Sequence, residues 1–202
     1  MTRSLALSAL AAALLAACSY LPGSMGGWQT LIDGEQGLQN FNRVGNANWR
    51  PEGGAIVADK GVGLLVSKQS YTDFEIRAEF WAATDTNSGI YIRCSDPAKV
   101  SSATAYEVNI WDIRPEPKYG TGAIVNVAAV PVPIANKAGG KWNVYEITAK
   151  GSQFTIRLNG VQTSSGQDGK HASGPFALQM GAGVKDVQGG AIKWRKVQIR
   201  PL

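Results

Sequence analysis

The chain has 202 residues, 20 Lys and Arg against 15 Asp and Glu, and a formal net charge of +5 at neutral pH. This length suits one domain with a single sizeable core, and we find no internal repeat that would indicate an array. The basic residues are spread along the sequence, and no basic cluster is interleaved with aromatic residues. The composition therefore predicts no nucleic-acid partner.

The N-terminal segment has the features of a targeting signal. Arg3 precedes an apolar run, LALSALAAALLAA, at residues 5–17. As a helix this run would cover roughly 20 Å, which is too short for a bilayer core of roughly 30 Å. We therefore expect residues 1–17 to form a cleavable signal peptide and not a membrane anchor.

The run ends in Leu15-Ala16-Ala17-Cys18, which resembles the lipobox of bacterial lipoproteins. An ordinary secretory signal ending in small residues is the alternative. Acylation of Cys18 would tie the chain durably to a membrane, and Ser19 with no Asp resembles the pattern sorted to the Gram-negative outer membrane. We expect a lipid-anchored protein of the bacterial cell envelope that faces the periplasm.

Residues 18–27 then read as a lipidated Cys and a flexible Gly-, Ser- and Pro-rich tether, and residues 28–202 as one folded domain. With Cys18 lipidated, Cys94 would be the only other cysteine, so no intramolecular disulfide is expected. We interpret Cys94 as a small buried apolar residue.

Short runs of β-branched and aromatic residues fill residues 28–202, separated by turn residues, and several alternate in polarity. In residues 74–80, Phe74, Ile76, Ala78 and Phe80 should face the core; in residues 106–112, Val108 and Ile110 should do so, leaving Glu107, Asn109 and Trp111 on the exposed face. Asn159-Gly160 lies between two such runs and predicts a hairpin. The pattern predicts an all-β fold, a two-sheet antiparallel β-sandwich of jelly-roll type.

Seven segments, in order, resemble those of the 3-keto-disaccharide hydrolase domain family, whose fold is concanavalin A-like. They are Gly27–Gly34, Trp49 with Gly53–Val57, Asp73–Phe80, Asn87–Arg93, Tyr106–Asp112, Leu158–Gly160 and the closing Ile199–Leu202. Trp142-Asn143 also fits the order. One departure is that Gln179-Met180-Gly181 stands where many members carry Q-x-H-G, so a histidine is absent.

The resemblance implies an enzyme that cleaves glycosides oxidised at C3, by base-initiated elimination at C2, with a carbohydrate as its partner. The alternative is a non-catalytic glycan-binding lipoprotein on the same scaffold, which the missing histidine favours. For catalysis we assign the base to Glu107, oxyanion stabilisation to Arg93 with Asn109 or Gln179, and leaving-group assistance to Asp112 or Tyr119.

The outward faces of the neighbouring strands supply the expected sugar contacts: Tyr91, Asn109, Trp111, Tyr119 and Gln179. Two structural interpretations remain open: Glu107 and Arg93 can form a cross-strand ion pair, and His171 can be a loop residue without catalytic importance. A calcium ion is a further candidate, held among Asp33, Asp85, Asp96 and Asp112, although no dense acidic loop is present. The metal content is left unknown.

Overall fold

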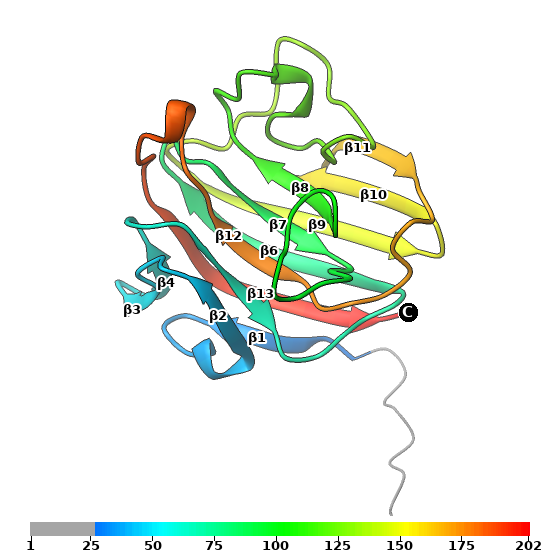
Figure 1. The fold of residues 1–202 in the computed structure, drawn as a ribbon, viewed down its shortest axis with the longest axis horizontal. Coiled ribbons are helices and arrows are strands. Elements are labelled where there is room, and N and C mark those ends of the chain that lie inside the picture. The colour runs from blue at the N-terminus through cyan, green and yellow to red at the C-terminus, as the bar shows by residue number, and fades with distance from the viewer. Residues whose placement is uncertain (1–26) are drawn as a thin grey trace, which may run out of the picture.

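The structure is a computed structural model that describes residues 27–202, and it is a sandwich of two antiparallel β-sheets (Figure 1). The predicted fold class is confirmed. The signal peptide at residues 1–17, the acylated Cys18 and nearly all of the tether at residues 18–27 lie outside the described residues. Within residues 27–202, no helix is both long and apolar enough to cross a membrane.

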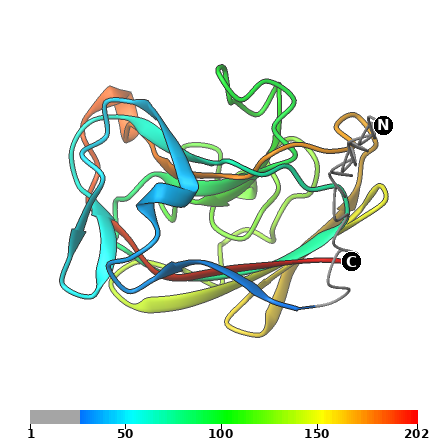
Figure 2. The ribbon, with the colours of Figure 1, turned by 90° about the horizontal axis from the view of Figure 1, so that it is seen from below.

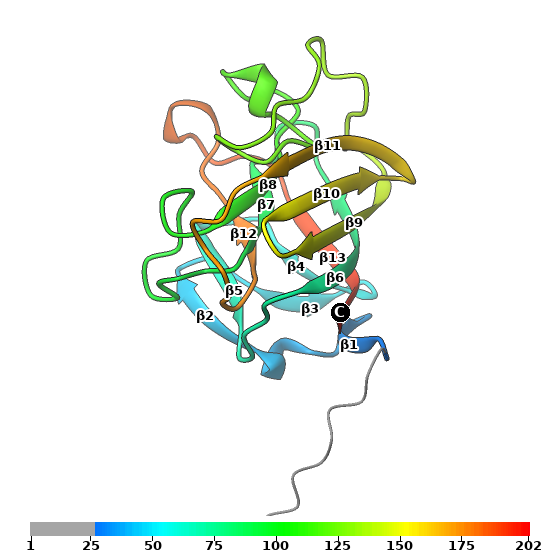
Figure 3. The same ribbon diagram turned by 90° about the vertical axis from the view of Figure 1, so that its right-hand side faces the viewer.

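The larger sheet, sheet A, has eight strands. Its order is β11 (Val161–Gln167), β10 (Gln153–Leu158), β9 (Trp142–Lys150), β6 (Phe74–Ala82), β13 (Ile192–Pro201), β4 (Ala55–Ala58) and β3 (Arg50–Glu52), and β1 (Gln29–Asp33) also pairs with β13. The strands β9, β10 and β11 lie side by side in Figure 3.

The smaller sheet, sheet B, has five strands in the order β2 (Phe41–Gly45), β5 (Gly63–Ser67), β12 (Ala177–Met180), β7 (Ser88–Ile92) and β8 (Tyr106–Ile110). Three short 3-10 helices, η1 (Leu38–Asn40), η2 (Pro117–Tyr119) and η3 (Val184–Asp186), lie in the connections. Figure 2 shows the two layers, with β13 of sheet A in red and β12 of sheet B in orange.

The core lies between the sheets and contains the residues that alternation assigned to it. Ile76 and Phe80 of β6 and Val108 of β8 are at most 1% exposed. The predicted hairpin joins β10 to β11, where Asn159 and Gly160 have φ of 53° and 80°. Positive φ at both central residues is the type I′ turn that Asn-Gly favours.

A long connection, residues 111–141, follows β8 and closes the free edge of sheet B. The main-chain N–H of Val125 donates to the carbonyl of Glu107 at 2.9 Å, and that of Asn109 donates to Ala123 at 3.0 Å. Val108 and Ile124 form an isolated antiparallel bridge. This pairing protects an edge strand that would otherwise present unpaired main-chain groups.

Candidate functional site

The outer face of sheet B, on the side away from the core, carries four of the predicted site residues. Tyr91 lies opposite Glu107, and Gly89 lies opposite Asn109, in the pairing of β7 with β8. On the other side of β7, Ala177 pairs with Tyr91, so Gln179 lies beside Gly89. A Cβ at Gly89 would come 3.4 Å from Gln179 Oε1, which shows that this glycine leaves open the space between the two amides.

Tyr91, Glu107 and Asn109 were expected to be exposed on this face, and that expectation is wrong, whereas Gln179 is half-buried. Glu107 is 6% exposed and Asn109 is fully buried. Tyr91 packs into a small apolar cluster on this outer face with Leu64, Val66, Cys94, Ala105 and Ala177, and Val100 of the β7–β8 connection packs against that cluster. The long connections before and after β8 thus cover part of sheet B.

Burial changes the acidity of Glu107. It raises the pKa of the carboxyl above its ordinary value, while the hydroxyl of Tyr91 and the guanidinium of Arg114 oppose this rise. Burial also raises the pKa of Tyr91, further so because of its negatively charged neighbour Glu107. Tyr91 therefore keeps its proton, and its hydroxyl can donate a hydrogen bond to an oxygen. A carboxylate with a raised pKa accepts a proton more readily than an exposed one.

Four buried polar atoms of this region lack a hydrogen-bond partner anywhere in residues 27–202. They are Asn109 Oδ1, Gln179 Oε1, Trp111 Nε1 and Arg114 Nε. The opposite ends of the two amides are fixed, because Asn109 Nδ2 donates to the carbonyl of Tyr119 at 2.6 Å and Gln179 Nε2 donates to Tyr91 Oη at 3.3 Å. Unpaired buried polar atoms are costly, so this arrangement suits a polar ligand.

Arg114 is a site residue that the sequence reasoning missed. Its guanidinium carbon lies 5.6 Å from the centre of the Trp111 ring, and its charge lowers the pKa of Glu107. It lies in the irregular connection after β8, where no alternation assigns a face. The one available signal was its place four residues after Ile110, close in sequence to the other candidates.

Arg93 was predicted to share the face of Tyr91 and to lie near Glu107, and this prediction is wrong. Its backbone has φ of 53°, which breaks the alternation directly after β7 ends. The buried guanidinium instead bonds to the carbonyl of Thr72 at 2.8 Å, to that of Gly151 at 2.6 Å and to Asp73 at 3.1 Å. Arg93 holds connections of the two sheets together, and it forms no cross-strand pair with Glu107.

Asp112 and Tyr119 were expected to assist the leaving group, but their contacts give them other roles. Asp112 Oδ1 accepts from Thr121 Oγ1 at 2.6 Å, and Oδ2 accepts from the main-chain N–H of Gly139 at 2.8 Å. Both carboxylate oxygens are therefore engaged in shaping the connection. Tyr119 reaches the site through its main-chain carbonyl, while its ring packs against the apolar cluster of Ala123, Val130 and Ile134.

His171 lies apart from this face. Its main-chain N–H donates to Tyr106 Oη at 2.9 Å, and its ring meets that of Tyr106 edge-on at 5.2 Å. Burial lowers the pKa of the imidazole. Because Tyr106 belongs to the core, these contacts give His171 a packing role at one end of the sandwich.

No three or more His, Cys, Asp or Glu side chains come together to hold a metal ion in residues 27–202. The carboxylate oxygens of Asp112 already accept hydrogen bonds from the protein, so this residue does not fit a calcium site.

The two antiparallel sheets define a β-sandwich of the concanavalin A and galectin type. A Bacillus subtilis protein described as having a galectin-like fold matches it with a TM-score of 0.62 at 7% identity, covering 84% of this chain and 93% of that one. The chain belongs to the family described as the 3-keto-alpha-glucoside-1,2-lyase-like domain, which matches residues 27–200. The resemblance drawn from the motifs is thus confirmed.

Similar solved structures support the fold. Two are from Parabacteroides distasonis ATCC 8503, each described as a "putative glycosyl hydrolase". One is 23% identical with a TM-score of 0.68, covering 88% of this chain and 100% of that one; the other is 19% identical with a TM-score of 0.70, covering 87% and 94%. The carbohydrate binding module CBM66 of Bacillus subtilis is 18% identical with a TM-score of 0.57, covering 88% and 97%. No curated protein sequence matches the chain.

Proposed function

We propose that the outer face of sheet B binds a glycoside oxidised at C3 and cleaves it by elimination. The observation that carries this proposal is the set of four buried, unpaired polar atoms around one buried carboxylate, Glu107. A sugar offers hydroxyl and carbonyl groups that can pair with such atoms, and the family to which the chain belongs is described by this chemistry.

In the proposed reaction, the Glu107 carboxylate removes the proton at C2, which the C3 ketone makes acidic. The electron pair of the broken C–H bond forms the C2–C3 enolate and places negative charge on the C3 oxygen. When the carbonyl re-forms, the pair moves to a C1–C2 double bond and the C1–O bond breaks. The leaving oxygen takes up a proton, and water can then add across the double bond to complete hydrolysis.

The neighbouring groups fit the other needs of this reaction. Arg114 supplies the positive charge that stabilises the enolate oxygen. Asn109 and Gln179 present amide oxygens that can accept from sugar hydroxyls, and the indole N–H of Trp111 can donate to one. Tyr91 keeps its proton beside Glu107. It can therefore protonate the leaving oxygen only as it takes up the proton that Glu107 removed from C2, which leaves Tyr91 protonated and restores the Glu107 carboxylate.

Incubating the purified protein with 3-keto-trehalose and 3-keto-lactose, and following the release of glucose, tests this proposal. Unoxidised trehalose and lactose are the matched controls, because they lack the ketone that acidifies the C2 proton. Cleavage of the keto-sugars alone is the expected result. Equal cleavage of both pairs would refute base-initiated elimination.

A second candidate is a glycan-binding protein without turnover. The observation that favours it is that the single histidine, His171, packs against Tyr106, whereas the resemblance to the family implies a histidine just after Gln179. In this case calorimetry would detect binding of keto-sugars or glycans, and no glucose would appear on prolonged incubation.

We further propose that the chain is anchored in the bacterial outer membrane, facing the periplasm, through an acylated Cys18. The support is the apolar run of residues 5–17 and the lipobox-like sequence that ends it. Cells fed a labelled fatty acid should incorporate the label into the wild type and not into Cys18→Ala. Equal labelling of the two proteins would contradict the anchor.

A further inference from the structure

The outer face of sheet A concentrates the positive charge of the domain. We define the basic face as the outward side chains of β6, β9, β10 and β13. These strands carry seven Lys and Arg, namely Arg77, Lys150, Arg157, Lys193, Arg195, Lys196 and Arg200, against the three acidic residues Glu75, Glu79 and Glu146. The remaining residues of 27–202 contain twelve basic and twelve acidic side chains. Nearly all of the net charge therefore lies on one face.

Two ion pairs within the basic face leave most of this charge free. Arg195 Nε lies 2.7 Å from Glu79, and Arg200 Nε donates to Glu75 at 2.6 Å. The other five basic side chains form no ion pair with any residue of 27–202. Because they face solvent on a single surface, they add to one positive field.

Tryptophans accompany the basic groups on the same face. Trp81 lies opposite Trp142 in the pairing of β6 with β9, and Lys193 lies opposite Trp81 in the pairing of β6 with β13. Each of three tryptophans is stacked by a cation: Lys193 on Trp81 at 5.0 Å, Arg195 on Trp142 at 4.4 Å, and Arg200 on Trp28 at 5.0 Å. Trp28 and Trp142 are 41% and 37% exposed. Tryptophan and basic residues together are typical of surfaces that meet lipid headgroups.

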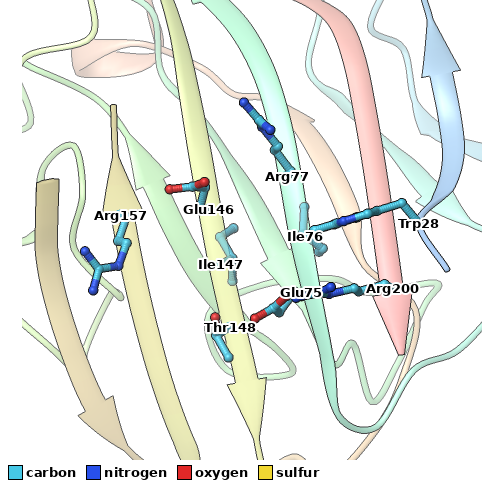
Figure 4. Close-up of a pocket in the computed structure, with 9 residues that line it drawn as sticks. All are labelled: Trp28, Glu75, Ile76, Arg77, Glu146, Ile147, Thr148, Arg157 and Arg200. Carbon is cyan, nitrogen blue, oxygen red and sulfur yellow. Dashed lines mark hydrogen bonds and ion pairs between the residues drawn. The ribbon is translucent and has the colours of Figure 1, made fainter. Parts of the chain in front are cut away.

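The chain also enters the domain at this face. Trp28 is the second described residue, and its ring lies beside Arg200 over a pocket of about 320 Å³ that Arg77, Glu146 and Arg157 also line (Figure 4). Nine residues, 19–27, separate Cys18 from Trp28. Fully extended, this stretch reaches only about 30 to 35 Å, so a lipid on Cys18 would hold the basic face close to the bilayer.

We propose that the basic face of sheet A lies against the anionic headgroups of the membrane that carries the lipid anchor. The inference rests on the acylation of Cys18 proposed above. A short tether converts weak headgroup contacts into intramolecular ones, so that even exposed charges orient the domain. The outer faces of the two sheets point in opposite directions, so the Glu107 site then opens away from the membrane and toward soluble glycosides.

The test uses the full lipidated protein reconstituted into phosphatidylcholine vesicles with about 30% phosphatidylglycerol, chosen as an anionic probe surface. A dye is attached at Thr148→Cys on the basic face, or at Ser102→Cys in the connection before β8, and quenchers are carried on the lipid headgroups. Cys94 will not compete for the dye, because it is buried and burial raises the pKa of its thiol to about 12. We expect the dye at Thr148→Cys to be quenched several-fold more than the dye at Ser102→Cys.

The charge dependence separates docking from simple tethering. The double variant Lys193→Gln, Lys196→Gln should abolish the difference between the two dyes, as should 1 M salt, where the Debye length is about 3 Å. The matched variant Lys68→Gln, Lys99→Gln removes two exposed charges outside sheet A and should preserve the difference.

Equal quenching at the two positions, or a difference that persists in pure phosphatidylcholine, would overturn the proposal. A soluble acidic polysaccharide such as polygalacturonate that binds the basic face and displaces it from the vesicles would instead make it a polysaccharide site. Failure of the protein to float with vesicles at all would refute the anchor itself, which is a separate result.

Discussion

Replacement of Glu107 by Gln separates a catalytic carboxylate from a structural one. Gln keeps the size and the hydrogen-bonding reach of the side chain but cannot accept the C2 proton as a base. We expect the rate of keto-sugar cleavage to fall by about 100-fold or more, which corresponds to at least about 2.7 kcal/mol of transition-state stabilisation. Binding of the keto-sugar should change far less, since the amide still donates to a hydroxyl.

The stability of the variant gives an independent measurement. Burial raises the pKa of Glu107 in the folded protein above the ordinary value of 4.5, so its ionised form disfavours the fold. The contribution of this group is therefore complete below the unfolded-state pKa and is lost as pH rises through the higher folded-state pKa. Glu107→Gln stays neutral, so at pH 7 it should melt at the wild-type temperature or above it.

The assay is single-turnover release of glucose from 3-keto-trehalose, with the melting temperature of each variant measured in parallel. Glu116→Gln, in an exposed stretch of the connection after β8, is the matched control and should behave as wild type. A Glu107→Gln protein that melts normally and retains the wild-type rate would refute the assignment. A lowered melting temperature with an intact rate per folded molecule would show that the carboxylate has a structural role only.

Four further substitutions test other parts of the structure. Arg114→Leu removes the charge that favours the Glu107 carboxylate, so the acidic limb of the pH–rate profile should move to higher pH; an unmoved limb would contradict their coupling. Arg93→Leu removes a buried guanidinium that bonds to the carbonyls of Thr72 and Gly151 and should lower the free energy of unfolding by about 1 to 3 kcal/mol in chemical denaturation; an unchanged midpoint would contradict a stabilising role for these bonds. Ile76→Ala should lower the free energy of unfolding by about 2 to 5 kcal/mol, and Arg77→Ala should change it by no more than about 0.5 kcal/mol. The reverse order would contradict the assignment of Ile76 to the core and of Arg77 to the outer face of β6.

The sequence predicted the fold wherever local rules decide the outcome. Strict alternation placed Ile76 and Phe80 in the core and Glu107 on the other face, because successive side chains of a strand point to opposite sides. Asn159-Gly160 specified its hairpin through positive φ. Short strands such as β4 and β5, buried on both faces, carry no such alternation. They can be placed only once their neighbours in the sheet are known.

The sequence predicted only some of the candidate site residues, and the errors of that prediction have physical causes. Arg93 itself adopts a positive φ directly after β7, and this turns its side chain away from the face that alternation assigned to it. The places of Asp112 and Arg114 depend on the path of a long connection, which is fixed by contacts distant in sequence, such as Asp112 with Gly139. No local pattern encodes those contacts, so Arg114, the guanidinium beside Trp111 that acts on the pKa of Glu107, was missed.

The connection after β8 has a consequence for how the proposed site would select among sugars. Asp112, near the start of this connection, accepts hydrogen bonds from Thr121 and from Gly139 near its end. Tyr145 Oη accepts from the N–H of Gly122 in the connection at 2.8 Å and donates to the carbonyl of Asn109 in β8 at 2.6 Å. A connection that is already held in place by these bonds loses little conformational entropy when a ligand binds. It also cannot rearrange to compensate for a ligand that fits poorly. A sugar that lacks a hydroxyl at the right carbon would leave the Asn109 or Gln179 oxygen buried and unpaired, and such a site rejects the deficient sugar far more strongly than a flexible one.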